Sequence, residues 1–293
     1  MVAMGTTPSA LARLLAPITQ VQFLQTYWEK AICVLHPGGA VYDDVLTEGD
    51  LDELLARNDL RFPTISLVKD GRSVPISQYS SVLRYGPYAA EGLIDADRVF
   101  RELNAGATVV CQLLQQSVQR TARFAAALAG ELGFRVDAHA FITPKNSVGL
   151  STHYDTTSSF ILQISGKKVW RLYEPVIELP TVDQVFHESA GASFTQTDEI
   201  VLERGDLLYV PRGIPHRPYT LDTPSVHVTL ALFSASWIDL FQRALTACGT
   251  EGLFRRAPRT SEDWSAAVQQ ELFQKLEAAA LATVTTLAGR DEG

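Results

Sequence analysis

Two kinds of hydrophobic pattern divide this chain of 293 residues. In the middle of the chain, short runs rich in β-branched and aromatic residues alternate with turns rich in Gly, Pro, Asn and Asp. Strands of this length at regular spacing predict an antiparallel sandwich or barrel. A tight turn at residues 165–167 is expected to separate the second run from the third. The predicted strands cover residues 134–143, 159–164, 168–173, 199–202, 206–210 and 225–232.

The flanks follow another pattern, in which apolar residues recur every three or four positions and so predict helices. The helices expected before the barrel cover residues 9–15, 21–30, 43–58, 95–103 and 118–132. Three strands, at 31–35, 62–69 and 107–111, are expected among them. Two further helical stretches, 237–248 and 261–287, follow the barrel and are separated by Pro258.

These patterns predict an α+β protein with a mainly β core. We expect a mixed region of helices and strands (1–104) that packs on the barrel, the β core itself (105–233) and a helical C-terminal region (234–293). The boundaries follow from the change between the two periodicities, because a period near 3.6 marks helices and a period of 2 marks strands.

Composition argues against several classes of protein. Hydrophobic residues make up 46% of the chain, and the net charge is −8 without any lysine or arginine block, so we expect no direct nucleic-acid binding. No apolar run reaches the ~18 residues of a membrane span. The N-terminus lacks the charged start and apolar stretch of a signal peptide. Cys33, Cys111 and Cys248 are widely spaced in apolar contexts, which is typical of buried thiols in a reducing compartment, so a cytoplasmic protein is expected.

The candidate chemistry centres on His153-Tyr154-Asp155 and on His216, which follows 63 residues (216 − 153) later. Two imidazoles and one carboxylate hold a divalent iron on one face and leave the opposite positions open for oxygen and a co-substrate. His153 and Asp155 share one face of an extended strand. His216 closes the segment 205–216, in which a glycine turn, a short apolar strand and a Pro-x-Gly turn deliver the histidine. The alternatives are a surface histidine beside a capping aspartate and a zinc hydrolase with the same three ligands.

Lys168 is the next candidate. It is the first residue of a predicted strand beside the metal-bearing segment. Because side chains alternate along a strand, Lys168, Trp170 and Leu172 lie on the same face of it. An inward Lys168 could pair with the far carboxylate of a dicarboxylate co-substrate. The alternative is an exposed turn lysine, as expected for its neighbour Lys167.

Other polar side chains could line the same pocket. His227 and Thr229 share one face of the last predicted strand. His139 lies on the strand before the site, where we expect a hydrogen-bonded histidine in the pocket wall. The remaining candidates for the pocket lining are Asn146, Tyr154, Ser159 and Gln163. His36 and His187 lie in polar loops and are expected to be solvated.

Several motifs together carry a family resemblance. The segment 205–216 matches the second cupin signature, Gly-x5-Pro-x-Gly-x2-His, whereas His153-x-Asp155 replaces the His-x-His of the first signature, an exchange typical of iron- and 2-oxoglutarate-dependent oxygenases. Over most of residues 10–250 the chain resembles the JmjC-type ribosomal-oxygenase (cupin-4) family of bifunctional lysine demethylases and histidyl hydroxylases. The other segments that carry this resemblance are 23–30, 141–150, 160–175 and 225–230.

The resemblance implies a double-stranded β-helix (cupin or jelly-roll) barrel in which His153, Asp155 and His216 bind iron(II). It also implies 2-oxoglutarate and O2 as co-substrates. Lys168, fifteen positions after the first histidine (153 + 15), would bind the far carboxylate of 2-oxoglutarate. The residues expected to help bind this co-substrate are Ser159, His227 and Thr229.

The resemblance further implies hydroxylation of an amino-acid side chain in a protein, a peptide or a peptide-like metabolite. Family members that act on ribosomal proteins usually carry a winged-helix domain, for which this sequence leaves no room after 234–293. A small-molecule hydroxylase of a biosynthetic pathway and a non-catalytic cupin that binds a ligand or metal remain the alternatives.

The tail is expected to mediate homodimerisation. Apolar residues recur at helical spacing on both of its predicted helices. Such stripes usually pack on a core, but they can also form a two-fold interface, and the family resemblance favours a homodimer. The residues of these stripes are Trp237, Leu240, Phe241, Leu245, Trp264, Val268, Leu272, Leu276 and Ala280.

Overall fold

The computed structural model describes residues 9–37, 42–57, 59–187, 193–259, 261 and 263–288. Residues 1–8 of the predicted N-terminal region lie outside these ranges. The chain divides into two compact units, Met1–Phe233 and Ser234–Gly293.

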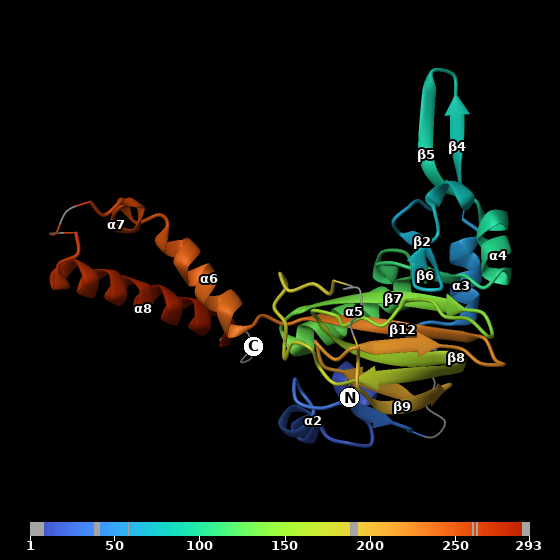
Figure 1. Ribbon diagram of the computed structural model, residues 1–293, viewed down its shortest axis with the longest axis horizontal. Helices are drawn as coiled ribbons and strands as arrows, with labels where there is room; N and C mark the ends of the chain where they lie inside the picture. The colour runs from blue at the N-terminus through green and yellow to red at the C-terminus, as the bar shows by residue number, and fades with distance from the viewer. Residues whose placement is uncertain are drawn as a thin grey trace, which may run out of the picture. The chain divides into compact units, whose positions relative to one another are not determined.

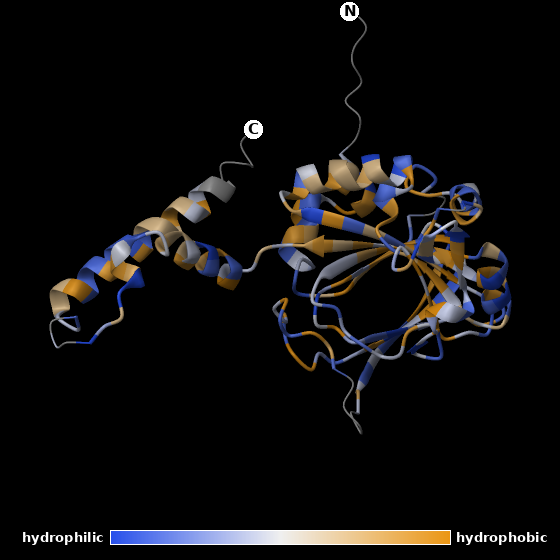
Figure 2. Ribbon diagram, turned by 90° about the horizontal axis from the view of Figure 1, so that it is seen from above, coloured by the Kyte–Doolittle hydropathy of each residue, from blue (hydrophilic) through white to orange (hydrophobic). Residues whose placement is uncertain are grey.

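One large antiparallel sheet forms the framework of the first unit, with the strand order β1-β10-β8-β12-β7-β6-β2-β3. In its middle, β12 (Ser225–Phe233) lies between β7 (Arg135–Thr143) and β8 (Ser158–Tyr173). β9 (Gln196–Glu203) and β11 (His216–Tyr219) pair with the second half of β8 and form a second wall. Figure 2 looks along these strands, which enclose the interior of a barrel. The expected α+β fold with a jelly-roll core is therefore confirmed.

Five shorter strands complete the large sheet. β1 lies at one edge and β3 at the other. The predicted strands at 62–69 and 107–111 are confirmed as β2 and β6, which pair with each other and join the sheet next to β7. The bounds of these strands are β1 (Cys33–Leu35), β2 (Ile65–Lys69), β3 (Arg72–Ser73), β6 (Thr108–Cys111) and β10 (Leu207–Val210).

β8 is a single strand of 16 residues, so the predicted turn at residues 165–167 is wrong. Gly166 lets the strand continue through this point, because it adopts a φ of +64° and a Cβ there would lie 1.7 Å from the carbonyl oxygen of Pro224. The pairing with β12 also shifts register between Val226 and His227. A glycine and a bulge thus produce a bend where the sequence indicates a turn.

The bend changes which side chains of β8 face the barrel interior. Before it, Ser159 and Ile161 line the interior pocket; after it, Lys168 and Trp170 do. A regular strand would keep odd and even positions on opposite faces throughout. Both halves of β8 therefore contribute to one pocket.

Helices lie against the outside of the barrel (Figure 2). The predicted helix at 118–132 is confirmed as α5 (Gln119–Leu132), and it ends at Gly133 in the left-handed conformation that glycine favours. Phe124 and Leu128 of α5 are buried in the main apolar core. The remaining helices of this unit are α1 (Ala10–Leu15), α2 (Gln20–Thr26), α3 (Glu48–Leu55), α4 (Ala96–Asn104) and the 3-10 helices η1 (Ile76–Gln78) and η2 (Leu114–Gln116).

A hairpin outside the large sheet has no counterpart among the predicted elements. β4 (Ser80–Tyr85) and β5 (Tyr88–Ile94) form a separate two-stranded sheet that projects from the barrel (Figure 1). Leu83, Tyr85 and Tyr88 are exposed on it. Since neither face of its outer half is buried, its sequence lacks the alternation from which strands are predicted.

The described part of the second unit contains three helices: α6 (Trp237–Cys248), α7 (Gly252–Arg255) and α8 (Ala266–Ala288). Both predicted helical stretches of the tail are confirmed by α6 and α8. Ser236 begins α6 with a capping box, in which Asp239 binds the backbone of Ser236 in return. Among the described residues, no helix has the length and apolar character needed to cross a membrane.

Candidate metal centre and pocket

Backbone hydrogen bonds hold the three candidate ligands in place. His153 and His216 form an isolated antiparallel bridge, in which the N–H of His216 donates to the carbonyl of His153 at 2.8 Å and the N–H of His153 donates back at 3.2 Å. The N–H of Gly213 donates to the carbonyl of Asp155 at 2.9 Å. Gly213 has a φ of +87°, and a Cβ there would lie 2.5 Å from the carbonyl oxygen of Ile177. The Pro-x-Gly turn before His216 is therefore a structural requirement of the site.

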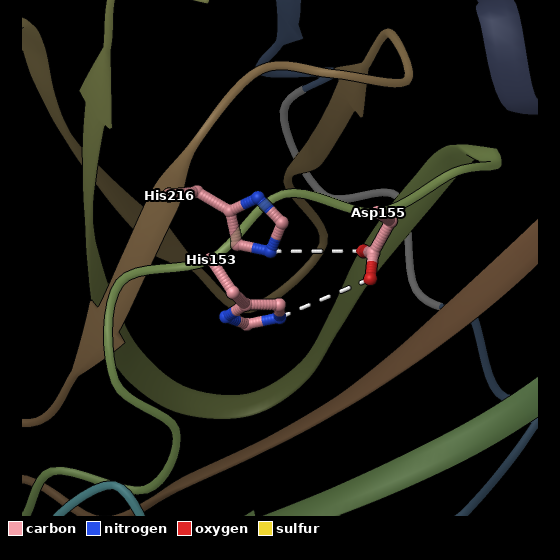
Figure 3. A group of neighbouring side chains, drawn as sticks. All are labelled: His153, Asp155 and His216. Carbon is pink, nitrogen blue, oxygen red and sulfur yellow. Dashed lines mark ion pairs between the residues drawn. The ribbon is translucent and has the colours of Figure 1, made fainter. Parts of the chain in front are cut away.

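The side chains of His153, Asp155 and His216 converge, and one ligand atom from each lies within 4.8 Å of the others. Figure 3 shows both imidazoles directed at the carboxylate, with Nε2 of His153 3.9 Å from Oδ1 and Nε2 of His216 3.7 Å from Oδ2 of Asp155. Two nitrogen donors and one carboxylate on one side are the donor set that suits iron(II) with open positions. The three residues therefore fit such a metal.

The second nitrogen of each imidazole is held by a backbone carbonyl. Nδ1 of His153 lies 2.8 Å from the oxygen of Ser151, and Nδ1 of His216 lies 3.1 Å from the oxygen of Ile214. Because a carbonyl only accepts, Nδ1 carries the hydrogen in both rings, and the lone pair of Nε2 faces the centre. Such contacts orient metal-binding histidines and set their tautomer.

Burial differs among the three ligands. Burial, with a smaller effect of the neighbouring His153, lowers the pKa of His216 to about 4, so this imidazole is neutral and available to a metal. The side chain of Asp155 is 44% exposed and that of His153 is 21% exposed. This end of the pocket, which we call the mouth, is therefore accessible to solvent.

Lys168 lies at the opposite, deep end of the pocket. The residue is 2% exposed, and its Nζ donates to Oγ1 of Thr143 at 2.7 Å and lies 3.5 Å from Nδ1 of His227. No ion pair joins Lys168 to a carboxylate within the described parts of the chain. Burial lowers the pKa of Lys168 to about 7. A buried ammonium without a counter-charge leaves room for an anionic ligand.

Aromatic rings form the wall between the two ends. The ring of His227 stacks on Phe141 with 4.7 Å between centroids and meets the edge of Trp170 at 5.3 Å. Burial lowers the pKa of His227 below its ordinary value, so its imidazole is neutral and packs as part of the wall. Trp170 also lies 5.7 Å from the ring of His216.

The pocket brings together seven of the eleven site residues predicted from the sequence. Its lining includes the three candidate metal ligands and all four residues expected to bind the co-substrate. The predicted residues in the lining are His153, Asp155, His216, Lys168, Ser159, His227 and Thr229. The four predicted residues outside the lining are Asn146, Tyr154, Gln163 and His139.

Tyr154 and Gln163 are engaged elsewhere. Tyr154 lies between two ligands in the sequence, but its hydroxyl donates to the carbonyl of Gln184 at 2.9 Å, and its ring packs edge-on against Phe186. The amide of Gln163 donates to the carbonyl of Ser165 and to the hydroxyl of Ser225, at 2.8 Å each. These local hydrogen bonds orient both side chains away from the pocket.

His139 and Asn146 serve the framework. Nδ1 of His139 accepts a hydrogen bond from the backbone N–H of Leu113 at 3.3 Å, and burial lowers its pKa. Asn146 has a φ of 54°, a left-handed conformation that asparagine tolerates in turns, and its N–H donates to the carbonyl of Leu221. Both residues lie beside the pocket lining without being part of it.

Phe141 and Trp170 belong to the lining but were not predicted, and Thr143, the partner of Lys168, was also missed. Alternation along β8 offered a signal for Trp170, because it shares a face with Lys168. Thr143 and Phe141 alternate in the same way on β7. Their approach to Lys168 and His227 depends on strand pairing, which a single sequence does not show.

Comparison with known proteins finds one matching domain model and several relatives. Residues 112–240 match the model of the JmjC domain. The chain is 28% identical to the bifunctional lysine-specific demethylase and histidyl-hydroxylase NO66 of Drosophila persimilis, over 94% of this chain and 41% of that protein. It is 30% identical to human ribosomal oxygenase 1, over 94% of this chain and 44% of that protein. The chain thus spans less than half the length of these two curated relatives.

The solved structures support the same fold. The ribosomal oxygenase YcfD of Escherichia coli matches with a TM-score of 0.59 and 18% identity, over 89% of this chain and 66% of YcfD. At this identity the likeness shows the fold alone. One structure of YcfD is a complex with cobalt and 2-oxoglutarate. The chain resembles the JmjC-type ribosomal oxygenases, and the resemblance seen in its sequence is supported by these relatives.

Proposed function

We propose that the protein is an iron(II)- and 2-oxoglutarate-dependent oxygenase that hydroxylates an amino-acid side chain in a protein or peptide. One observation carries this proposal: a single pocket has His153, Asp155 and His216 at its mouth and the buried Lys168 at its deep end. Iron bound at the mouth would use O2 and 2-oxoglutarate to hydroxylate a carbon–hydrogen bond, with release of succinate and carbon dioxide. The names of the curated relatives point to the same chemistry.

Different residues of the chain bind the metal and the co-substrate in the proposed reaction. His153, Asp155 and His216 hold the metal and leave positions open toward the pocket. Lys168 binds the far carboxylate of 2-oxoglutarate and holds a proton on Nζ when that carboxylate is present. The apolar walls exclude water, which strengthens this ion pair because the local dielectric is low. Ser159, His227 and Thr229 line the space between the two ends.

The charge of the pocket favours an uncharged target side chain. Within the described lining, Asp155 is the only acidic residue, and it serves as a metal ligand. A cationic N-methyl-lysine would enter this space without a counter-charge, which is costly in an apolar environment. We therefore favour hydroxylation of an uncharged side chain over demethylation of lysine.

Succinate formation tests the proposal. Purified protein is incubated with Fe(II), ascorbate and 2-oxoglutarate, alongside His153→Ala and the control His187→Ala, which alters an exposed histidine outside the pocket. We expect oxygen-dependent succinate from the parent protein and from His187→Ala, and none from His153→Ala. If the protein neither turns over 2-oxoglutarate nor is stabilised by it against heat, the non-catalytic cupin replaces the oxygenase.

We also propose that the protein is a homodimer that associates through its second unit. Trp237, Phe241 and Leu245 recur on one face of α6 and are 67%, 53% and 51% exposed. Exposed apolar stripes of this kind mark interaction surfaces. Light scattering should show a dimer for the parent protein and for Gln242→Asp, and a monomer for Phe241→Asp. A dimer that survives Phe241→Asp would contradict the proposal.

The finer domain division and the compartment are further proposals. We propose residues 105–233 as the catalytic core and 1–104 as a region that completes the barrel, since β1, β2 and β3 join the same sheet. We propose a cytoplasmic location, supported by the burial of three free cysteines. Fractionation of cells that express the protein tests this location, and recovery with membranes or in the medium would contradict it.

A further inference from the structure

The indole N–H of Trp170 is buried without a hydrogen bond. Trp170 is 3% exposed, and its Nε1 has no hydrogen-bond partner among the described residues. Burial of a polar group without a partner costs free energy, so buried donors in proteins are nearly always satisfied. Trp170 also lines the pocket. The missing partner is therefore expected to be a ligand.

Its place along β8 puts Trp170 between the two ends of the pocket. Lys168, Trp170 and Leu172 are alternate positions on one face of this strand. Across the ladder, Leu172 pairs with His216, and Trp170 pairs with Pro218. A molecule that reaches from the metal centre to the ammonium of Lys168 must therefore pass the indole of Trp170.

We infer that the indole N–H of Trp170 donates a hydrogen bond to an oxygen of the 2-oxo dicarboxylate bound between the metal centre and Lys168. This inference rests on the proposed function. An indole only donates, so its partner must be an acceptor, and a 2-oxo dicarboxylate offers only acceptor oxygens when ionised. A hydrogen bond to a charged group changes affinity by about ten- to 100-fold. Trp170 thus both shapes the wall and selects an oxygen-rich ligand.

Two other buried polar atoms without partners help to define this role. Oγ of Ser159 also lines the pocket and has no described partner, but a hydroxyl can donate or accept and so does not reveal the ligand's chemistry. Oε1 of Gln163 is an acceptor outside the lining. Among these three atoms, only Nε1 of Trp170 both belongs to a residue of the lining and has a fixed donor role.

The indole resonances test the inference directly. The chain has four tryptophans, so a 15N–1H correlation spectrum contains four indole signals, and Trp170→Phe identifies the one from Trp170. The probe is 2-oxoglutarate added to the Zn2+-loaded protein, because Zn2+ is diamagnetic. We expect the Trp170 proton to move downfield and to exchange more slowly with water. Trp28, Trp237 and Trp264 lie outside the pocket lining and serve as internal references.

Affinity provides the second measurement. Calorimetry with Zn2+-loaded protein should show that Trp170→Phe, which keeps a ring but removes the donor, weakens 2-oxoglutarate binding by about ten- to 100-fold. Metal affinity should be unchanged, whereas the melting temperature should fall because a buried ring loses atoms. Trp28→Phe is the matched control, because Trp28 packs against Phe23 and Phe134 away from the pocket.

The outcomes separate the inference from the proposed function. Unchanged affinity in a folded Trp170→Phe, or a Trp170 signal that does not move downfield when 2-oxoglutarate binds, would overturn the inference and leave the oxygenase intact. If Trp170→Phe fails to fold, the spectrum of the parent protein decides alone. If the parent protein does not bind 2-oxoglutarate at all, the proposed function fails, and the inference fails with it.

Discussion

The two ends of the pocket differ in exposure to solvent and in charge. At the mouth, the side chain of Asp155 is 44% exposed, and the side chains of three candidate metal ligands converge. At the deep end, Lys168 is 2% exposed and contacts Thr143 and His227, neither of which carries a negative charge. The mouth therefore gathers groups that bind a cation, whereas the deep end places a lysine where no acidic side chain of the described residues lies beside it.

This difference explains why one pocket can assemble a metal and a dicarboxylate together. Ligands near solvent lose less hydration when no metal is bound, so the mouth can remain preformed. A buried lysine is destabilised when charged, and burial lowers its pKa to about 7. Each end is stabilised by what it binds, and the rings of Phe141, His227 and Trp170 make the space between them largely apolar.

The largest effect is expected at the mouth. Asp155→Ala removes the only carboxylate of the centre and should lower turnover by more than about 100-fold, because even groups that only orient metal ligands change affinity or activity by about 10- to 100-fold. Metal content after loading and succinate formation measure this loss. Asp183→Ala, at an exposed position outside the pocket, is the control. Full metal affinity in Asp155→Ala would place the metal elsewhere.

The deep end is tested by a change that keeps volume and removes charge. Lys168→Met should weaken 2-oxoglutarate binding by about 30-fold or more, because loss of one partner of a buried charge pair costs about 2–5 kcal/mol. Metal binding at the mouth should persist. Lys167→Met is the matched control, since Lys167 is exposed and pairs with Glu203. Equal effects of the two substitutions on calorimetric affinity would refute the assigned role of Lys168.

The deep end also predicts how affinity depends on pH. Lys168 in the empty pocket titrates near pH 7 because it is buried, whereas a bound carboxylate would raise its pKa. Above about pH 7, binding must therefore take up a proton, and affinity for 2-oxoglutarate should fall by about tenfold per pH unit. Calorimetry in buffers of different ionisation enthalpy measures this uptake. The slope should vanish in Lys168→Met; a slope that remains would belong to the mouth.

The lowered pKa of Lys168 has the opposite effect on the stability of the ligand-free protein, which should rise with pH. The pKa of Lys168 in the folded protein, about 7, lies below the ordinary lysine value of 10.5. Between these two pH values the unfolded chain therefore binds more protons than the folded protein. The contribution of Lys168 to stability therefore rises with pH through this range. Thermal unfolding without ligand should show this rise in the parent protein, relative to Lys168→Met.

The sequence predicted the mouth better than the wall. His153, Asp155 and His216 were identified because their spacing and the Pro-x-Gly turn follow from the chemistry of a metal site. Their convergence in the structure depends on the bridge between His153 and His216. Metal ligands can thus be predicted from the sequence, because few residue types can bind a metal and their spacing is restricted.

The wall depends on local geometry that single positions do not show. Odd-numbered residues of β8, such as Ser159, face the pocket before Gly166. After the bend at this glycine, the even-numbered residues Lys168 and Trp170 face it instead. Gln163 keeps the expected parity, yet its amide is bound to Ser165 and Ser225. The strands and most helices follow from periodicity, whereas the hairpin β4–β5 does not, because its outer half buries neither face.

The smallest effect is expected from Tyr154, which lies between two ligands in the sequence but outside the pocket. Tyr154→Phe removes the hydrogen bond to the carbonyl of Gln184 and keeps the ring against Phe186. One such bond contributes about 1 kcal/mol, which corresponds to about 2–4 °C in Tm for a unit of this size. Turnover should change by less than about fivefold.

Tyr154→Ala sharpens this test, because it also removes the ring and should destabilise the protein by about 3–5 kcal/mol. Melting curves and succinate formation are measured for both variants. If Tyr154→Phe keeps its Tm but loses turnover, the hydroxyl acts on the reaction itself. The mouth would then include Tyr154, and its hydrogen bond to Gln184 would have to break when substrate binds.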